Sequence, residues 1–176
     1  MAEAAAICVV SGAEGSAIQE FIAATAAALR TAGANVVGVV GEEHGLPDRS
    51  CSAGFLVDIA SGTRFAMYRD VPEPGRTCHI DAEGVEAACA TVLPQIAGSD
   101  LVVLNKFGKL EAAGQGLWPA LAAARDAGKP VLLAVSRRHA EAFGSAAPGA
   151  VVVAPDGAAF ARWWDETGPA QRCDTL

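Results

Sequence analysis

Apolar and polar positions follow two different periods along this chain, and the change of period predicts strands that alternate with helices. Short continuous apolar runs are typical of strands buried on both faces, as in a parallel sheet. The runs that predict strands are residues 5–10, 35–40, 101–104, 131–135 and 150–153. Apolar residues at helical spacing predict helices at residues 15–33, 81–96, 117–128, 139–143 and 156–164. A strand, a helix and a second strand in this order form a βαβ unit, which crosses over right-handedly.

One part of the pattern departs from this alternation. Two shorter runs, at residues 53–59 and 64–68, are joined by a turn that contains glycine, and they predict an antiparallel hairpin. Polar residues 41–49 before the hairpin and proline-bearing residues 71–78 after it are expected to be loops. We therefore expect a three-layer α/β fold with a mostly parallel sheet. The single domain covers residues 1–167, with a hairpin insertion over about 51–70 and a frayed tail at 168–176.

Composition narrows the class of protein. A chain of 176 residues that is 52% hydrophobic and 19% charged can build a full core, which excludes a disordered protein. A formal net charge of −7 argues against a general nucleic-acid binder, which would need a basic face. The sequence contains neither an apolar run long enough to span a bilayer nor the basic flank of a signal peptide. We expect a cytoplasmic protein without membrane contact, in which thiols such as Cys8 and Cys89 stay reduced.

The end of the apolar run at residues 101–104 is the most informative feature of the chain. It is followed at once by Asn105, Lys106, Gly108 and Lys109. In an open α/β sheet, ligands bind at the carboxyl ends of the strands. Many nucleotide hydrolases carry an Asp-Glu pair at this point, whereas this chain has Asn-Lys. The pattern indicates a nucleotide-binding fold whose hydrolytic groups have been replaced. The alternative is that the lysines belong to a solvent-exposed loop and bind no ligand.

The first strand is followed by a turn of small residues that occupies the position of a P-loop. The turn consists of Gly12, Ala13, Glu14, Gly15 and Ser16. A complete motif would end in Gly, Lys and Ser or Thr, where this chain has Ala17, Ile18 and Gln19. The missing lysine matters, because a charge about 4 Å from a phosphate contributes on the order of 4 kcal/mol at an effective dielectric constant of 20. Lysines 106 and 109 are candidates to replace it, since we expect their strand to lie beside the first one. The alternative is a turn with a structural role alone.

Two further groups could carry chemistry. Arg137 and Arg138 follow the strand at residues 131–135 and could hold a phosphate, or they could simply begin a helix. Cys51, Cys78 and His79 flank the hairpin, where they could bind a soft metal or, for the thiols, form a reversible disulfide. Because no CxxC spacing supports such a centre, the sequence does not predict a metal site.

Four segments together resemble a known family. They are residues 12–19, the hairpin GFLVDIASGTRFAM, the segment DLVVLNKFGKLE and the segment KPVLLAVSRRH. Their order is similar to that in the THEP1-like nucleoside triphosphatases, which are P-loop proteins, and the NKFGK-x-E core resembles the DUF2478 family. The resemblance implies a phosphate loop at Gly12 to Ser16. It further implies that Asn105 and Lys106 replace the metal-binding and catalytic carboxylates, and that Arg137 and Arg138 lie near the nucleotide.

We therefore expect a degenerate P-loop protein that binds a small anionic ligand without efficient hydrolysis. The ligand would be a nucleotide, a phosphorylated metabolite or an oxyanion such as molybdate, and the link to molybdenum metabolism is implied by the resemblance alone. One alternative is an active nucleoside triphosphatase that uses Lys106 or Lys109. Another alternative is a regulatory or structural partner of a larger enzyme, in which the ligand site is vestigial. In that case Trp163 and Trp164 would be exposed and would not close the core. The sequence is also compatible with a homo-oligomer.

Overall fold

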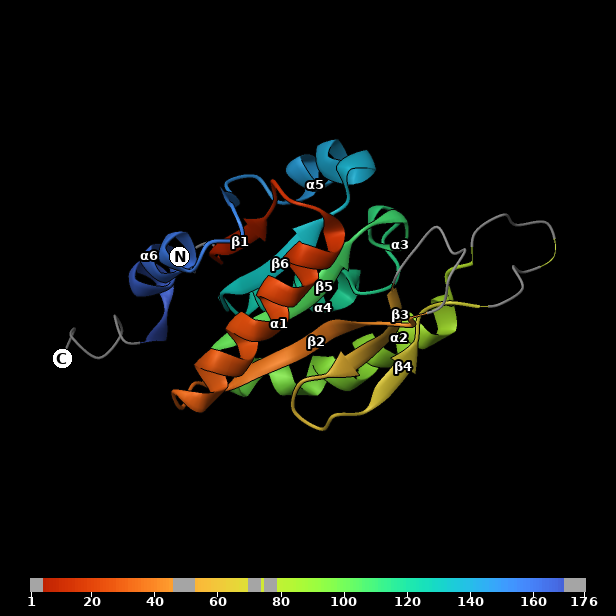
Figure 1. Ribbon diagram of the computed structural model, residues 1–176, viewed down its shortest axis with the longest axis horizontal. Helices are drawn as coiled ribbons and strands as arrows, with labels where there is room; N and C mark the ends of the chain where they lie inside the picture. Colours follow the sequence, from red (N-terminus) through yellow and green to blue (C-terminus); the bar gives the residue numbers. More distant parts are fainter. Residues whose placement is uncertain (1–4, 46–52, 70–73, 75–78, 170–176) are drawn as a thin grey trace.

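The computed structural model describes residues 5–45, 53–69, 74 and 79–169, and within them it contains a seven-stranded sheet in the order β4-β3-β2-β5-β6-β1-β7 (Figure 1). The strands are β1 (Ile7–Val10), β2 (Val36–Glu43), β3 (Ala53–Asp58), β4 (Arg64–Ala66), β5 (Leu101–Phe107), β6 (Val131–Val135) and β7 (Val151–Val153). The five strands from β2 to β7 in this order are parallel, and β3 and β4 add an antiparallel hairpin at one edge. The predicted mostly parallel α/β sheet with an inserted hairpin is confirmed.

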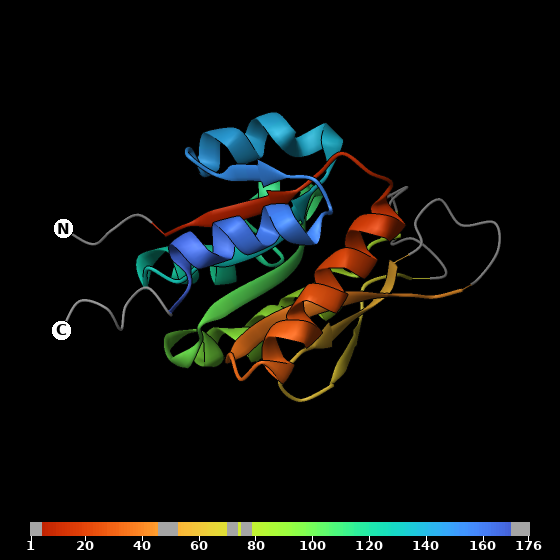
Figure 2. The ribbon, with the colours of Figure 1, turned by 60° about the vertical axis from the view of Figure 1, so that its left-hand side comes forward.

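Helices cover both faces of the sheet and make three layers. They are α1 (Gly15–Thr31), α2 (Ala82–Val92), η1 (Leu93–Gly98), α3 (Lys109–Ala112), α4 (Trp118–Asp126), η2 (Arg137–His139), α5 (Ala140–Ala146) and α6 (Gly157–Thr167). One hydrophobic core lies between the sheet and α1 with α6, and the other lies between the sheet and α2 with α4 (Figure 2). Along β1, Cys8 and Val10 belong to the first core, whereas Ile7 and Val9 belong to the second. This alternation explains the continuous apolar runs in the sequence.

Strand β2 is longer than the predicted strand at residues 35–40. It continues to Glu43, because its second half pairs antiparallel with β3, from Val39 opposite Asp58 to Glu42 opposite Phe55. Residues 41–43, which we expected in a loop, are therefore part of the sheet. The sequence pattern ended where the residues became polar, but backbone pairing continues through polar positions when a neighbouring strand supplies the partners.

Strand β5 also departs from the prediction in two respects. It does not end at Leu104 but continues to Phe107, with a bulge at Asn105 that shifts the register against β6. Moreover, β5 does not lie beside β1, because β6 pairs with both of them. Strand order is decided by the packing of the whole sheet, and the local apolar pattern contains no information about it. The bulge brings Asn105 into the buried interior, with 2% of its surface exposed.

The helices of the second half follow the predicted pattern with small shifts. Asp81 caps α2, since its side chain accepts a hydrogen bond from the Gly84 amide at 3.2 Å. The predicted helix over residues 81–96 is α2 followed by the 3-10 helix η1, and Leu93, where the chain tightens into η1, is 38% exposed. Trp163 is buried and Trp164 is partly buried, and both pack in the core around α6. The two tryptophans close the core, and they do not form an exposed patch.

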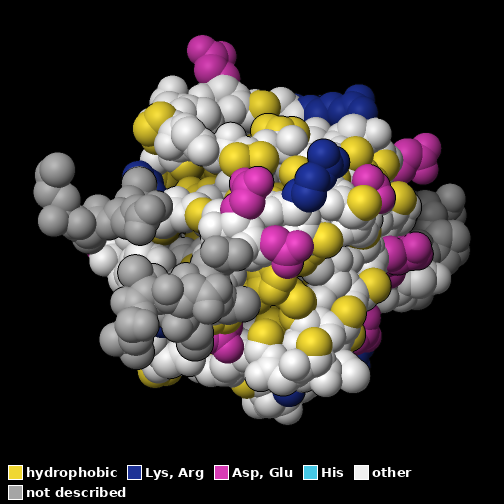
Figure 3. Space-filling view, turned by 90° about the vertical axis from the view of Figure 1, so that its left-hand side faces the viewer, with side chains coloured by type: hydrophobic (Ala, Val, Ile, Leu, Met, Phe, Trp, Pro, Cys, Tyr) yellow, Lys and Arg dark blue, Asp and Glu magenta, His cyan; other side chains and the backbone are white. Residues whose placement is uncertain are grey.

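The surface mixes hydrophobic and charged side chains. On the face shown in Figure 3, single acidic and basic side chains stand among hydrophobic ones. In the part of the chain that the structure describes, we find no helix with the length and apolar character needed to cross a membrane. Residues 71–78, predicted as a loop, lie outside the described residues apart from Pro74, and so do residues 170–176 of the predicted tail.

Candidate functional site

The carboxyl ends of β1, β5 and β6 meet at one edge of the sheet, beside the N-terminus of α1 (Figure 1). A cavity of about 380 Å³ lies there, which we call the polar cavity. It is lined by residues 11–15 before and at the start of α1, by Ile18 and Gln19 on α1, by Asn105 and Lys106 on β5, and by residues 134–137 at the end of β6. The structure thus brings the Gly12 turn, Asn105 and Lys106 to one cavity, although β6 separates their strands.

The turn after β1 is shorter than a P-loop. Gly12 has a φ of 92°, a conformation that favours glycine, and α1 already begins at Gly15 with Glu14 as its N-cap. Gly15 and Ser16, which we expected in a phosphate loop, are therefore the first residues of the helix. Ser16 is exposed and does not line the polar cavity, so its role as a ligand-binding residue stays a prediction. The first-turn amides of a helix have no intrahelical partner and carry a partial positive charge, which favours an anion in this region.

Two carboxamides converge on the floor of the polar cavity. A Cβ atom on Gly41 of β2 would lie 2.7 Å from Asn105 Oδ1 and 3.1 Å from Gln19 Oε1, so both side chains meet over this glycine. Gln19 Oε1 is buried, and none of the described residues donates a hydrogen bond to it. The resemblance implies a hydroxyl at position 19 and a carboxylate at position 105, both around a magnesium ion. This chain instead has the neutral amides of Gln19 and Asn105 there. Ile18, at the position of the P-loop lysine, packs against the core under α1.

The charged side chains of the polar cavity are mixed. Lys106 and Arg137 bring two positive charges to its lining, and Glu14 brings one negative charge. All three side chains belong to exposed residues. Glu14 does not use its carboxylate to cap α1, because it makes no side-chain hydrogen bond to the helix. The rim is therefore positive by one charge, in a chain whose formal net charge is −7.

Not every predicted basic residue reaches this cavity. Lys109 and Gly108 line a neighbouring cavity, and Arg138 is exposed and lines neither of the two. Lys106 lines both cavities, whereas Lys109 lines only the neighbouring one. The sequence placed Arg137 and Arg138 side by side, but in η2 successive side chains point in different directions.

A buried carboxylate holds the loop after β5 in place. Glu111 is 8% exposed, and its two oxygens accept hydrogen bonds at 3.0 Å from the amides of Gly108 and Leu117. Gly116 has a φ of 60°, and a Cβ at this position would lie 2.5 Å from Glu111 Oε1. The Gly108 amide is thus already occupied and is not available to a ligand. Glu111 connects the end of β5 to the start of α4 and makes this side of the site rigid.

The candidate metal ligands do not form a centre among the described residues. Cys51 and Cys78 lie outside them. The ring of His79 stacks on Tyr68 with centroids 5.0 Å apart, and its Nδ1 lies 2.9 Å from the backbone oxygen of Arg69. Within the part that the structure describes, no group of three or more His, Cys, Asp or Glu side chains could hold a metal ion.

Sequence reasoning missed Gly41 and treated Gln19 only as a departure from a motif. A glycine inside a strand often marks a close approach of other atoms, and Gly41 could have been found by this signal. It was overlooked because residues 41–49 were expected to be a loop. Ser136, which lines the polar cavity, gave no signal in the sequence.

Comparison with known proteins agrees with the fold. The structure is similar to the solution structure of a human cancer-related nucleoside triphosphatase, with a TM-score of 0.55 over 86% of this chain and 88% of that one. The two sequences are 18% identical, so this similarity shows that the two proteins share an α/β fold and shows nothing about activity. Over 140 residues, or 77% of the chain, the sequence is 34% identical to the molybdenum import ATP-binding protein ModC 2 of Bradyrhizobium diazoefficiens, and the match spans 15% of that protein. The model of the family described as "Protein of unknown function (DUF2478)" matches residues 6–163, and the chain belongs to this family.

Proposed function

We propose that this protein binds a nucleotide, a phosphorylated metabolite or an oxyanion in the polar cavity and does not hydrolyse it efficiently. The observation that carries the proposal is the pair of carboxamides from Gln19 and Asn105 beside the cation of Lys106. Amide N–H groups and an ammonium group donate hydrogen bonds to phosphate or molybdate oxygens without a bridging metal ion.

The same residues explain why hydrolysis should be lost. Magnesium prefers carboxylate and hydroxyl oxygens, and an attacking water needs a carboxylate or another group to activate it. Asn105 and Lys106 supply neither function, and Ile18 removes the charge of the P-loop lysine. The remaining carboxylate at the polar cavity, on Glu14, belongs to an exposed residue at the start of α1. The ligand would therefore be held as an anion and released unchanged.

Isothermal titration calorimetry tests this proposal with ATP, inorganic phosphate and molybdate as separate probes. We expect at least one of them to bind with the same affinity in magnesium and in EDTA, because no metal ion takes part. Lys106→Ala should weaken this binding at least tenfold, since a hydrogen bond to a charged group contributes about 1.5–3 kcal/mol. Absence of binding by all three probes at millimolar concentration would refute the proposal.

A second candidate function is that of an active nucleoside triphosphatase. It is favoured by the position of Lys106, which lines the same cavity as the Gly12 turn and could replace the missing lysine. Lys109 is a weaker candidate because it does not line this cavity. Multiple-turnover phosphate release from a magnesium–nucleotide complex, abolished by Lys106→Ala, would establish this activity in place of simple binding.

Molybdate is the first oxyanion to test, because a relative that is 34% identical over 140 residues is a molybdenum import ATP-binding protein. This relative is much longer than the matched segment, so a role in molybdenum metabolism is a proposal. The alternative of a regulatory or structural partner of a larger enzyme is a proposal as well. We also propose a cytoplasmic location, in which the buried thiols of Cys8 and Cys89 stay reduced.

A further inference from the structure

We propose that the ligand is an organic anion with a flat apolar part, and that this part enters a second cavity under the hairpin. The inference rests on the proposed function, because it assumes that the anionic group occupies the polar cavity. It narrows the ligand class from any small anion to a phosphate ester or a similar anion that carries a ring.

The second cavity has a volume of about 310 Å³, and we call it the apolar cavity. Its walls are mainly hydrocarbon and come from four places in the fold. They are Leu56 on β3, Met67 after β4, Ile80 and Val85 around the start of α2, and Leu110 with Leu117 around α3. Small-molecule sites typically have volumes of about 300–1,000 Å³ and apolar walls with a few polar groups. The cavity is therefore large enough for a ring but not for a macromolecule.

The two cavities adjoin each other. They share Gly15, Gln19, Asn105, Lys106 and Ser136 in their linings, so a ligand that reaches into both would contact the two carboxamides. Exposed Lys109 and the buried carboxylate of Glu111 also line the apolar cavity and bring one charge of each sign. The space under the hairpin is thus mostly apolar, whereas the polar cavity, with Lys106 and Arg137 against Glu14, is positive by one charge. This division of charge matches an organic anion, whereas a bare oxyanion would leave the apolar walls in contact with water.

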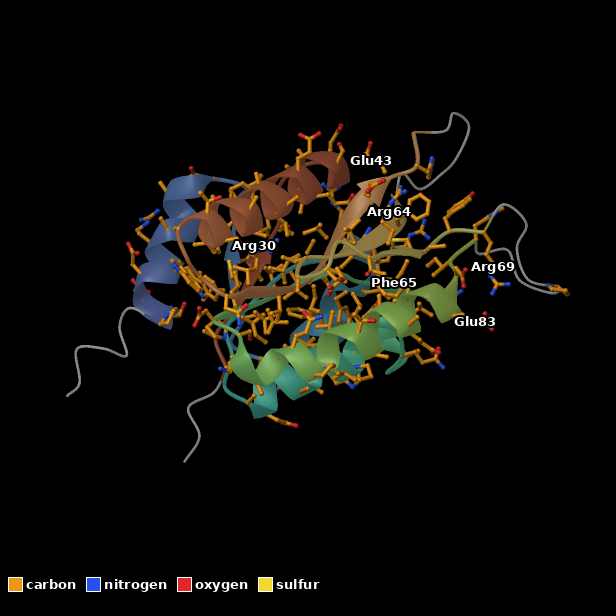
Figure 4. All side chains as sticks on the ribbon, turned by 90° about the horizontal axis from the view of Figure 1, so that it is seen from below. Arg30, Glu43, Arg64, Phe65, Arg69 and Glu83 are labelled. Atoms are coloured by element: carbon orange, nitrogen blue, oxygen red, sulfur yellow. The ribbon has the colours of Figure 1, made fainter. Side chains whose placement is uncertain are left out.

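The walls of the apolar cavity belong to packed elements. Leu56 and Val85 are buried in the core, with 0% and 2% of their surfaces exposed. The helix α2 packs directly on the hairpin, because a Cβ on Gly84 would lie 1.7 Å from the backbone oxygen of Ala66. Figure 4 shows this arrangement, with β4 and Phe65 above α2.

The backbone of Met67 is fixed on both sides. Its amide donates to the Gly54 oxygen, and its oxygen accepts from the Asp81 amide, both at 3.0 Å. The side chain of Met67 is partly buried and packs against the core. The cavity is therefore a preformed space, and Met67 is a position where its volume can be changed without altering strand pairing.

A pair of probes that differ by one ring tests the inference. Inorganic phosphate and 1-naphthyl phosphate carry the same anionic group, and calorimetry with the full chain measures both. We expect naphthyl phosphate to bind at least tenfold more tightly, because the naphthyl ring leaves water and fills the apolar cavity. If both probes bind equally, the inference is wrong while the proposed function stands. If neither phosphate probe binds, and ATP and molybdate do not bind either, both the inference and the proposed function fall.

Two substitutions of Met67 test whether the naphthyl ring binds in the apolar cavity. Met67→Trp fills the apolar cavity and should remove the preference for naphthyl phosphate, leaving phosphate affinity within twofold of the unchanged protein. Met67→Ala is the matched control, because it also removes the native side chain but enlarges the cavity, and it should keep at least half of the preference. A preference that survives Met67→Trp, in a variant with an unchanged circular dichroism spectrum, would place the ring elsewhere and overturn the inference. Loss of the preference in both variants would overturn it as well, since volume would then not be the cause.

Discussion

Neutralising Glu14 should strengthen anion binding, which is the reverse of the usual outcome when a residue of a binding site is changed. Glu14 lines the polar cavity and is the N-cap of α1, so its carboxylate lies where the helix favours an anion. It makes no side-chain hydrogen bond to the helix, and the substitution Glu14→Gln therefore removes a charge but no cap. The native carboxylate and a bound phosphate repel each other, and this repulsion lowers the affinity of the protein as it stands.

The expected magnitude follows from the exposure of Glu14. At about 4 Å in a dielectric of bulk water, two unit charges interact by about 1 kcal/mol, and salt screens this interaction further. Glu14→Gln should therefore tighten anion binding by up to about fivefold at low ionic strength, and the gain should decline as sodium chloride rises to about 0.5 M.

Calorimetric titration of phosphate or molybdate into Glu14→Gln measures this effect against a matched control. Glu20→Gln removes the same charge from the same helix, at an exposed position outside the linings of both cavities. We expect the control to change affinity by less than a factor of 1.5. Equal effects of the two substitutions would show that only net charge matters, and weaker binding in Glu14→Gln would contradict the placement of the anion at the start of α1.

Three further outcomes test the site and the core. Arg137→Ala should weaken anion binding about tenfold, whereas Arg138→Ala, which changes an exposed residue outside the polar cavity, should leave the dissociation constant unchanged within a factor of two. Gly41→Ala should lower the free energy of unfolding by about 1–3 kcal/mol in a urea titration, because its Cβ would lie 2.7 Å from a buried carboxamide oxygen on β5; Gly98→Ala, with nothing within 4 Å of its Cβ, is the control. Burial raises the pKa of Cys8 from 9.0 to about 12, so the unfolded state loses this proton first as the pH rises. The free energy of unfolding should then fall between pH 9 and pH 12 by up to about 1.4 kcal/mol per pH unit from this thiol, and urea titrations of Cys8→Ala should show a shallower decline.

Part of the candidate site could be predicted because strand ends are visible in a sequence. The apolar run before Asn105 and the polar residues after it identified the carboxyl edge of the sheet, where ligands bind in open α/β folds. Lys106 was named for this reason, and it does line the polar cavity. Ser16 and Arg138 were named by the same reasoning, but they lie outside that cavity, because the direction of a side chain depends on where the next helix begins.

The sequence by itself determined the order of strands and helices, the hairpin insertion and the two buried faces of the sheet, because local periodicity and turn residues report burial directly. Only the tertiary structure decided that β6 lies between β1 and β5, since strand order depends on how helices cross the sheet. It also decided the extension of β2 through Gly41 and the bulge at Asn105, both of which come from pairing between segments far apart in the chain. The two carboxamides meet over Gly41 for that reason, and contacts of this kind leave no local pattern in the sequence.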